Sequence, residues 1–381
     1  MRRVKQLDWV LLVPYLVLSI IGLLEIYSAS SYRLLVNHQA ATSLLIKQFI
    51  FMLLSWFVIG VTYSLKLRYF LQYRIAKIGI IVSLVTLIMV KVGLFAVTVN
   101  GAQRWLSIFG FQFQPAELAN LALILYLAYV FRSATSIPKK LLQTVLIVIT
   151  MAILVLFQPK IAGAFMILFI AGMMFWAALL PFKKGAMIAG GATLGLVLVA
   201  GGVLFLGSHD LLPGIFAHAY ERIALVKNPF LDEHGSGYQM ANSYYALYNG
   251  GLFGRGIGNS ITKKGYLPES ETDFIFSILT EELGLIVALG VILLLFGLCL
   301  RLFQLATKTA NQQAALILLG IGLLIFSQTC INLASILGFI PMTGVPLPFI
   351  SYGGTSYLIL SFAIGLALNI SANQKRGGLD A

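Results

Sequence analysis

Apolar runs of about 20 residues recur from one end of the chain to the other, and they constrain its fold more than any other feature. A helix needs about 20 mostly apolar residues to cross the hydrocarbon core of a bilayer. These runs are continuous and too long for the short alternating strands of a β-barrel. The sequence therefore predicts an all-α, polytopic membrane protein with about ten transmembrane helices, at residues 9–28, 46–65, 75–95, 114–132, 142–158, 161–180, 185–207, 273–300, 312–338 and 352–372.

Composition and cysteine content agree with this class. Hydrophobic residues make up 59% of the 381 positions and charged residues only 10%, against about 25% charged in soluble domains. Cys299 and Cys330 both fall inside apolar runs, and two such thiols suggest neither a disulfide framework nor a metal site. No internal repeat and no low-complexity linker divides the sequence. We therefore predict a single membrane domain over residues 1–381.

The basic residues are distributed unequally between the two sides of the predicted helices. With ten spans both termini lie on one side, which carries about 16 of the 26 Lys and Arg residues and about two acids. The other side carries about ten basic and about eleven acidic residues. Since Lys and Arg mark the cytoplasmic side, we expect cytoplasmic termini. The net charge of +13 then reflects a cytoplasmic collar facing lipid headgroups, and we expect no nucleic-acid partner.

One predicted loop is far longer than the others. Residues 208–272 join the seventh and eighth predicted helices on the external side, and long loops in compact folds are usually functional. The loop contains NGGLFGRGIGNS (249–260), whose glycines permit close backbone approach to a ligand or an anion-binding nest. A flexible re-entrant loop explains the glycines equally well. Three nearby cations, Arg255, Lys263 and Lys264, favour the functional interpretation.

The same loop ends in GYLPESETDFIF (265–276), which holds the carboxylates Glu269, Glu271 and Asp273. Acids are costly where a chain enters a membrane. Asp273 is the last polar residue before a long apolar run, and partial burial would raise its pKa unless a cation partner lowers it again. We therefore predict that Asp273 acts as a base, whereas Glu269 and Glu271 remain either solvated or weakly metal-assisting.

Other polar residues also gather on the predicted external side. Arg104 and Trp105 precede Pro115, which favours a helix start and places Glu117 in the first turn of the fourth predicted helix. Lys160 occupies a tight turn in LFQPKIAG (156–163), and the Pro- and Gly-rich segment 338–356 contains Ser351 and Tyr352. Such a segment at membrane depth must be buried in protein or line a wet cavity. Glu25, near the outer end of the first helix, is expected to snorkel to the interface.

Two classes of function fit this layout. A transporter would place polar residues in mid-membrane, but four predicted helices carry almost no charge at their centres and no inverted halves are visible. An enzyme acting on a membrane-bound substrate would need a carboxylate base, with cations or a metal beside a leaving phosphate. No P-loop and no dinucleotide fingerprint occurs, so we expect no nucleotide cofactor. The residues favour the enzyme over the transporter.

Four segments together resemble the signature of the SEDS family, the shape, elongation, division and sporulation proteins. They are GAQRWLSIFGFQFQPAELA (101–119), ERIALVKNPFLDEHGSGYQ (221–239), the segment 245–284 around NGGLFGRGIGNS and TDFIF, and IPMTGVPLPFISYGGTS (340–356). The match runs in order through nearly the whole chain. NGGLFGRGIGNS followed by GYLPE is more similar to the division type than to the elongation type.

The resemblance implies a ten-helix peptidoglycan glycosyltransferase of the bacterial plasma membrane, with its active site facing outward. It would polymerise lipid II together with a class B penicillin-binding protein and other divisome proteins. Asp273 matches the essential acid of the family, either as general base on the 4-hydroxyl of GlcNAc or as a ligand of a divalent cation, Mg²⁺ or Mn²⁺. That hydroxyl attacks the anomeric carbon of MurNAc, inverts its configuration and expels undecaprenyl diphosphate.

The remaining site residues expected from the sequence would bind the substrate, and we infer that Arg255, Lys263 or Lys264 offsets the charge of the diphosphate. The full set is Arg104, Trp105, Glu117, Lys160, Gln239, Arg255, Lys263, Lys264, Ser351 and Tyr352. Two alternatives remain open at this point. A lipid II flippase would use the same external polar residues as a transport path, and an elongation-type polymerase would share the chemistry.

The sequence departs from the family pattern at two positions. The family usually has a Lys three residues after the Glu of QPAE, where this chain has Asn120. The family usually reads QPD after the fifth helix, where this chain has Lys160 in place of the acid. We predict that Lys160 supplies the missing positive charge and pairs with Glu117. Neutral drift at both positions in a tolerant site is the alternative.

Overall fold

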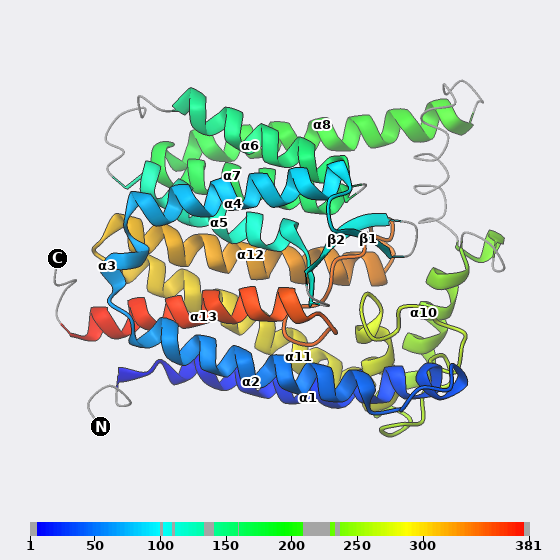
Figure 1. Ribbon diagram of the computed structural model, residues 1–381. Coiled ribbons are helices and arrows are strands. Elements are labelled where there is room, and N and C mark those ends of the chain that lie inside the picture. Colours follow the sequence, from blue (N-terminus) through cyan, green and yellow to red (C-terminus); the bar gives the residue numbers. More distant parts are fainter. Residues whose placement is uncertain are drawn as a thin grey trace.

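The structure is a computed structural model that describes residues 6–99, 102–108, 111–132, 141–158, 160–208, 229–232 and 237–376. A helix occupies each of the predicted apolar runs (Figure 1). These helices are α1 (Trp9–Val36), α2 (Ser43–Ser64), α4 (Tyr73–Val92), α5 (Pro115–Val130), α6 (Leu141–Leu156), α7 (Ile161–Leu179), α8 (Phe182–Ser208), α11 (Ile275–Lys308), α12 (Gln312–Ile336) and α13 (Gly354–Lys375).

The helices differ in how much of their surface the protein itself covers. Seven of the described helices are long and apolar enough to cross a membrane, and α5 and α6 are apolar but shorter. The most apolar stretches of α12 and α13 are 78% buried, against 22% for α2. α12 lies against α5, α7, α11 and α13, so it forms the centre of the bundle. The chain is a multi-pass membrane protein, and the exact number of ten spans stays a prediction.

The described ends of the chain lie together. The guanidinium Nε of Arg376 donates to Oε1 of Gln6 over 2.6 Å. Figure 1 shows the start of α1 and the end of α13, with the short helix α3 (Leu67–Phe70), at one end of the bundle. The opposite end carries α10 (Tyr238–Gly250) and a small β-sheet. The described ends of the chain therefore lie at the same end of the bundle, and their cytoplasmic location stays a prediction.

That sheet is a local exception to the all-α fold class, which is otherwise confirmed. The sequence predicted helix to residue 95 and then a loop. Instead α4 ends at Val92, because Gly93 adopts a left-handed φ of 85° that terminates the helix. Three antiparallel strands follow in the order β1-β2-β3, namely β1 (Ala96–Val99), β2 (Ala102–Ile108) and β3 (Phe111–Phe113).

The long predicted loop contains ordered structure that the sequence did not suggest. The 3-10 helix η2 (Pro229–Asp232) and α10 both fall within residues 208–272. Residues 209–228 and 233–236, which include much of the motif ERIALVKNPFLDEHGSGYQ, lie outside the described residues. α10 contacts the start of α11 through a 2.7 Å hydrogen bond between the hydroxyls of Ser243 and Ser277.

Candidate active site

Asp273 lies two residues before the first residue of α11, where the loop enters the bundle. The side-chain amide of Asn332, on α12, donates to the backbone carbonyls of Asp273 (3.0 Å) and Val345 (2.8 Å). These two hydrogen bonds join the segment 338–356 to the residues before α11. The backbone position of Asp273 is therefore fixed from a helix at the centre of the bundle.

Ser351 and Tyr352 were predicted to bind substrate, but the structure uses them to hold this backbone. The hydroxyl of Ser351 donates to the carbonyl of Thr272 over 2.6 Å and accepts from the amide of Leu347 over 2.8 Å. The amide of Tyr352 donates to the carbonyl of Glu271 over 2.9 Å. Because the hydroxyl of Ser351 already donates and accepts within the protein, we assign Ser351 a positioning role. The phenol of Tyr352 is half-buried, and its contact with substrate stays a prediction.

The carboxyl of Asp273 sits among charges of both signs. Burial raises its pKa to about 6, with Glu269 and Glu271 adding to the increase, while Lys160 and Arg104 oppose it. Gly344 lies beside this carboxyl, since a Cβ there would be 3.4 Å from Oδ2 of Asp273 and 3.6 Å from Nη1 of Arg104. The predicted base and a predicted cation thus face the same space.

Arg104 reaches this space from an irregular position in β2. Val97 pairs with Trp105, and Thr98 pairs with Gln103, so Arg104 is the extra residue of a β-bulge. Bulges redirect side chains and are common beside active sites. The Nε of Arg104 donates to the carbonyl of Gln158 over 3.0 Å. Trp105 is half-buried in the same strand, and its contact with substrate stays a prediction.

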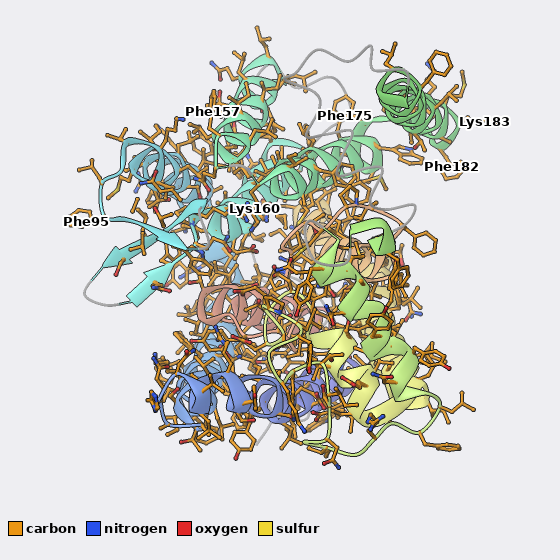
Figure 2. The ribbon with its side chains drawn as sticks, turned by 90° about the vertical axis from the view of Figure 1, so that its right-hand side faces the viewer. Phe95, Phe157, Lys160, Phe175, Phe182 and Lys183 are labelled. Carbon is orange, nitrogen blue, oxygen red and sulfur yellow. The ribbon has the colours of Figure 1, made fainter. Side chains whose placement is uncertain are left out.

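The predicted partnership of Lys160 and Glu117 is present. The Nζ of Lys160 lies 3.1 Å from Oε1 of Glu117, and their side chains are 3% and 4% exposed. The amide of Gln328 donates to the other carboxylate oxygen of Glu117 over 2.9 Å. Figure 2 shows Lys160 inside the molecule, whereas Phe95 and Phe182 lie at its periphery. The ion pair is therefore internal and joins α5 to the turn before α7.

In the described part of the chain, several buried polar atoms without hydrogen-bond partners belong to residues near this pair or near Asp273, and four others lie on α1, α2 and α4. An unsatisfied buried polar group costs about 1–3 kcal/mol, so a group of them indicates a place prepared for a polar ligand or ordered water. Those near the pair or near Asp273 are Oδ1 of Asn120, both amide atoms of Gln158, Oε1 of Gln328, Oδ1 of Asn332 and Oγ1 of Thr343. Sequence reasoning missed Gln158, Gln328 and Asn332, although amides at i and i+4 inside an apolar run were a usable signal.

The glycine-rich segment 249–260 forms an anion-binding loop, but the anions it binds belong to the protein. Glu281 accepts hydrogen bonds from the amides of Ile261 (3.1 Å) and Thr262 (3.3 Å). Glu282 accepts from the amide of Gly258 (2.8 Å) and from Nζ of Lys263 (2.7 Å). Lys263 is 5% exposed in this pair. A buried carboxylate therefore already compensates the charge of Lys263, and its contact with a substrate diphosphate stays a prediction.

Close backbone contact explains why two glycines are needed there. α11 is interrupted at Gly284, whose φ is 83°. A Cβ on Gly254 would lie only 2.2 Å from the carbonyl of Glu282. The amides of Arg255 and Gly256 instead bond the carbonyls of Glu281 and Glu282 over 3.0 and 2.9 Å. The loop is thus attached to the kinked helix rather than freely re-entrant.

The remaining predicted residues occupy varied surroundings. Arg255 and Lys264 are exposed, and Gln239 is half-buried in the first turn of α10, so their contacts with substrate stay predictions. Glu271 is buried and paired with Arg33, a residue that sequence reasoning did not select. Glu25 does not snorkel. It is 1% exposed, because α1 packs against α11 and turns this side chain toward Glu282 and Lys263.

Comparison with known proteins places this geometry in a family. Residues 8–376 match the profile of the family described as cell cycle protein, which groups FtsW, RodA and SpoVE. The chain belongs to this SEDS family. The probable peptidoglycan glycosyltransferase FtsW of Enterococcus hirae is 68% identical over 370 residues, covering 97% of this chain and 93% of the relative. The protein of the same name from Lactococcus lactis is 36% identical over 393 residues, covering 97% and 93%.

Solved structures of the same family have the same fold. One chain matches with a TM-score of 0.73 at 26% identity. Its structure is described as "Structural coordination of polymerization and crosslinking by a peptidoglycan synthase complex". The match covers 96% of this chain and 97% of that one. The rod shape determining protein RodA of Thermus thermophilus matches with a TM-score of 0.67 at 25% identity, covering 96% of each chain. The relatives confirm the SEDS assignment and its FtsW type.

Proposed function

We propose that this chain is a peptidoglycan glycosyltransferase that polymerises lipid II into glycan strands during cell division. The observation that carries the proposal is the carboxyl of Asp273, whose pKa burial raises to about 6, beside Arg104 and Lys160. The name of the Enterococcus hirae relative, at 68% identity, supports the activity. A flippase would need no general base, so the surroundings of Asp273 favour the enzyme.

Asp273 acts as the general base in this proposal. Its carboxylate accepts the proton of the GlcNAc 4-hydroxyl while the hydroxyl oxygen forms a bond to the anomeric carbon of MurNAc. The bond from that carbon to the phosphate oxygen breaks, and its electron pair leaves with undecaprenyl diphosphate, so the configuration inverts. A base with a pKa near 6 is largely ionised at neutral pH and is stronger than an ordinary Asp.

Two cations stabilise the negative charge that develops on the leaving group. Arg104 offers a planar guanidinium suited to phosphate oxygens. Lys160 is held by Glu117, so it can remain charged in a buried site while its electrostatic field reaches Asp273. Exposed Arg255 and Lys264 can add charge at the rim. In this chain Lys160 performs the role that the family usually gives to a Lys at the position of Asn120.

The carboxylates present suit a divalent cation only in part. Within the described residues, no group of three or more His, Cys, Asp or Glu side chains could hold a metal ion. Asp273 and nearby Glu269 offer carboxylate oxygens, and Mg²⁺ is commonly bound by one or two carboxylates together with substrate phosphates. Mg²⁺ or Mn²⁺ bound there would neutralise charge on the diphosphate.

The partner and the orientation follow the same proposal. The structural relative from a peptidoglycan synthase complex supports a class B penicillin-binding protein as partner, with other divisome proteins around the pair. Asp273 lies directly before α11, whose first turn is bonded to α10, and α10 lies at the end of the bundle opposite the described ends of the chain (Figure 1). With cytoplasmic termini the site faces outward, where lipid II presents its sugars.

One experiment tests the activity and separates it from transport. The purified chain, with its partner penicillin-binding protein, receives lipid II in detergent, where translocation has no meaning. We expect glycan strands from the unchanged chain and none from Asp273→Ala. Absence of strands under Mg²⁺ and Mn²⁺, with translocation of lipid II in vesicles, would instead establish a flippase.

A further inference from the structure

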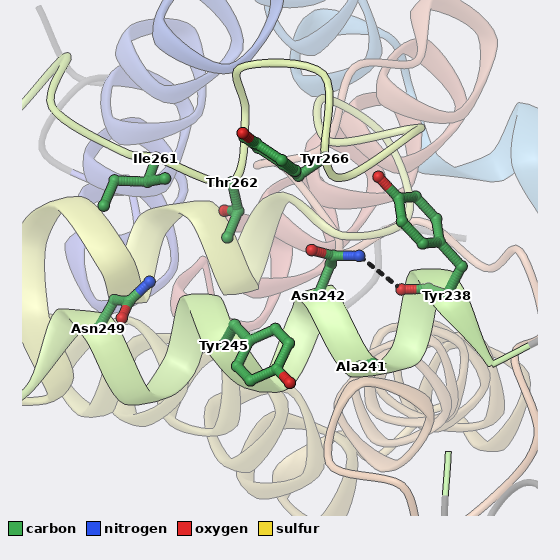
Figure 3. A pocket seen from close by; sticks show the side chains of 8 residues that line it. All are labelled: Tyr238, Ala241, Asn242, Tyr245, Asn249, Ile261, Thr262 and Tyr266. Atoms are coloured by element: carbon green, nitrogen blue, oxygen red, sulfur yellow. Dashed lines mark hydrogen bonds between the residues drawn. The ribbon is translucent and has the colours of Figure 1, made fainter. Parts of the chain in front are cut away.

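A groove between α10 and the loop 261–266 has no part in the mechanism above. Its volume is ≈ 570 Å³, within the range of about 300–1,000 Å³ that is typical of ligand sites. Figure 3 shows the side chains along it, which come from one face of α10 and from the facing loop: Tyr238, Ala241, Asn242, Tyr245, Asn249, Ile261, Thr262 and Tyr266.

The chemistry of this lining suits a sugar polymer. Tyrosine, asparagine and threonine predominate, and none of the lining residues is charged, in a chain of net charge +13. A pyranose ring has apolar C–H faces that pack on aromatic rings and hydroxyl edges that hydrogen-bond to amides and phenols. An uncharged groove offers nothing to balance a diphosphate. The lining therefore selects the glycan part of the product rather than its lipid-linked end.

Tyr245 and Tyr266 can be reached from outside, and the amides between them are held in place. Tyr245 and Tyr266 are 43% and 52% exposed. Nδ2 of Asn242 donates to the carbonyl of Tyr238 over 2.9 Å, and Nδ2 of Asn249 donates to Oε1 of Glu281 over 3.3 Å. Such bonds hold the amides along the groove before any ligand arrives. This is the arrangement of a preformed binding site.

The groove adjoins the segment that carries the proposed base. Tyr266 precedes Asp273 by seven residues in the same loop. On the other wall, the 2.7 Å bond from Ser243 to Ser277 attaches α10 to the first turn of α11, directly after Asp273. Both walls of the groove are therefore attached to the segment that carries Asp273.

We propose that this groove binds the growing glycan strand as a row of sugar subsites. The proposal rests on the polymerase activity proposed above. A strand that stays bound between additions is extended repeatedly by the same molecule, whereas an unbound strand leaves after few additions. The groove thus sets the length of the product.

Glycan length measured in the lipid II assay tests the proposal. Tyr245→Ala and Tyr266→Ala each remove one ring, and we expect the mean strand length to fall by a larger factor than the rate of lipid II consumption. Tyr245→Phe keeps the ring and should keep the length. Tyr248→Ala is the matched control, since Tyr248 lies on the same helix, is 85% exposed and does not line the groove. Unchanged length in both alanine variants would overturn the proposal.

A binding measurement distinguishes failure of the groove from failure of the activity. The full-length Asp273→Ala chain is titrated with a β-1,4-linked GlcNAc tetrasaccharide, with maltotetraose as the control sugar. We expect the GlcNAc tetrasaccharide to bind and maltotetraose not to bind. Tyr245→Ala should weaken binding of the GlcNAc tetrasaccharide roughly 2- to 10-fold, because one ring no longer packs on the sugar. No strand synthesis by the unchanged chain counts against the polymerase. Equal tetrasaccharide binding with weakened binding of the partner protein would make the groove a protein interface and would overturn the sugar assignment.

Discussion

The carboxylate of Asp273 and those of Glu281 and Glu282 lie within ten residues of each other in the sequence, and the fold treats them in opposite ways. Glu281 and Glu282 are fully buried, and each accepts several hydrogen bonds from the glycine-rich loop and its flanking residues. In the described part of the chain, no side chain donates a hydrogen bond to the carboxylate of Asp273. Lys160 acts electrostatically on Asp273. Near Lys160, side-chain atoms of Asn120, Gln158 and Gln328 are buried and have no hydrogen-bond partner among the described residues.

The difference separates the scaffold from the site. A buried charge that is fully hydrogen-bonded stabilises one backbone conformation and has no capacity left for a ligand. A carboxyl with no side-chain donor among the described residues, and with buried unpaired amides elsewhere around the site, has an energetic reason to accept substrate groups. The pair Glu281 and Glu282 therefore determines the shape of the loop, whereas we propose that the surroundings of Asp273 carry out the chemistry.

The largest effect is expected at the carboxyl of Asp273. Asp273→Asn removes the base while keeping the size of the side chain, so the polymerisation rate should fall about 10²- to 10⁴-fold. The melting temperature in detergent should not fall, since no side-chain hydrogen bond to the carboxylate is lost. Retained polymerisation with lipid II would remove Asp273 from the mechanism.

Replacing Lys160 by Ala should abolish detectable polymerisation while the protein remains folded. The same change leaves Glu117 as an uncompensated buried charge, which typically costs about 3–5 kcal/mol of stability. A second Glu117→Gln substitution should recover the melting temperature but not the activity. Full activity of Lys160→Ala would show that the charge at this position is dispensable.

A charge exchange sharpens the same test. Lys160→Asp combined with Asn120→Lys moves the cation three residues past Glu117 and restores the usual family pattern. Both positions are buried at this end of the bundle. We expect the double variant to polymerise lipid II and the single Lys160→Asp variant not to. If the single and the double variant lose polymerisation equally, the cation must stand at position 160 in this chain, and a positive charge at position 120 does not replace it.

In the hydrogen-bonded pair Glu281 and Glu282, the substitution Glu282→Gln should mainly lower the stability of the fold. It leaves Lys263 buried without its carboxylate, with an expected loss of about 3–5 kcal/mol. Thermal unfolding and polymerisation, measured on the same preparation, show whether Glu282→Gln lowers stability, activity or both. Activity per folded molecule should stay close to that of the unchanged chain. A large loss of activity at unchanged stability would make the loop part of the catalytic machinery.

The pH dependence should follow the raised pKa of Asp273. Below about pH 6 the carboxyl is protonated and cannot accept the proton of the hydroxyl, so the rate should fall about tenfold per unit. Above about pH 7 the rate should be constant, because the carboxylate is already ionised. Initial rates between pH 5 and 8 test this, and a profile level down to pH 5 would contradict it.

The smallest effects are expected at the exposed cations. Lys264→Ala should change stability by less than about 0.5 kcal/mol, since its side chain is exposed. Its effect on polymerisation should be limited to a modest rise in KM for lipid II that shrinks at high salt, as expected for a screened surface charge. Arg255→Ala serves as a parallel variant. A large fall in kcat for either would place that cation at the leaving group.

Much of the fold was predictable because its main determinant is local. Each apolar run predicts one helix without reference to the rest of the chain. The observed helices agree with the predicted ranges apart from shifts at their ends. The sheet after α4 and the helix α10 were missed, because short polar segments carry no strong periodicity. Asp273 was selected as a candidate from its position between a polar loop and an apolar helix, and its role as the base stays a prediction.

The sequence by itself determined the membrane class, the helix positions, the SEDS resemblance and the candidate base. Only the tertiary structure decided which charges are compensated. Lys160 pairs with Glu117 across 43 residues of sequence, while Lys263 is paired internally with Glu282. Hydrophobic patterning acts along one helix, whereas the availability of a charge depends on distances between helices, and packing alone sets those distances.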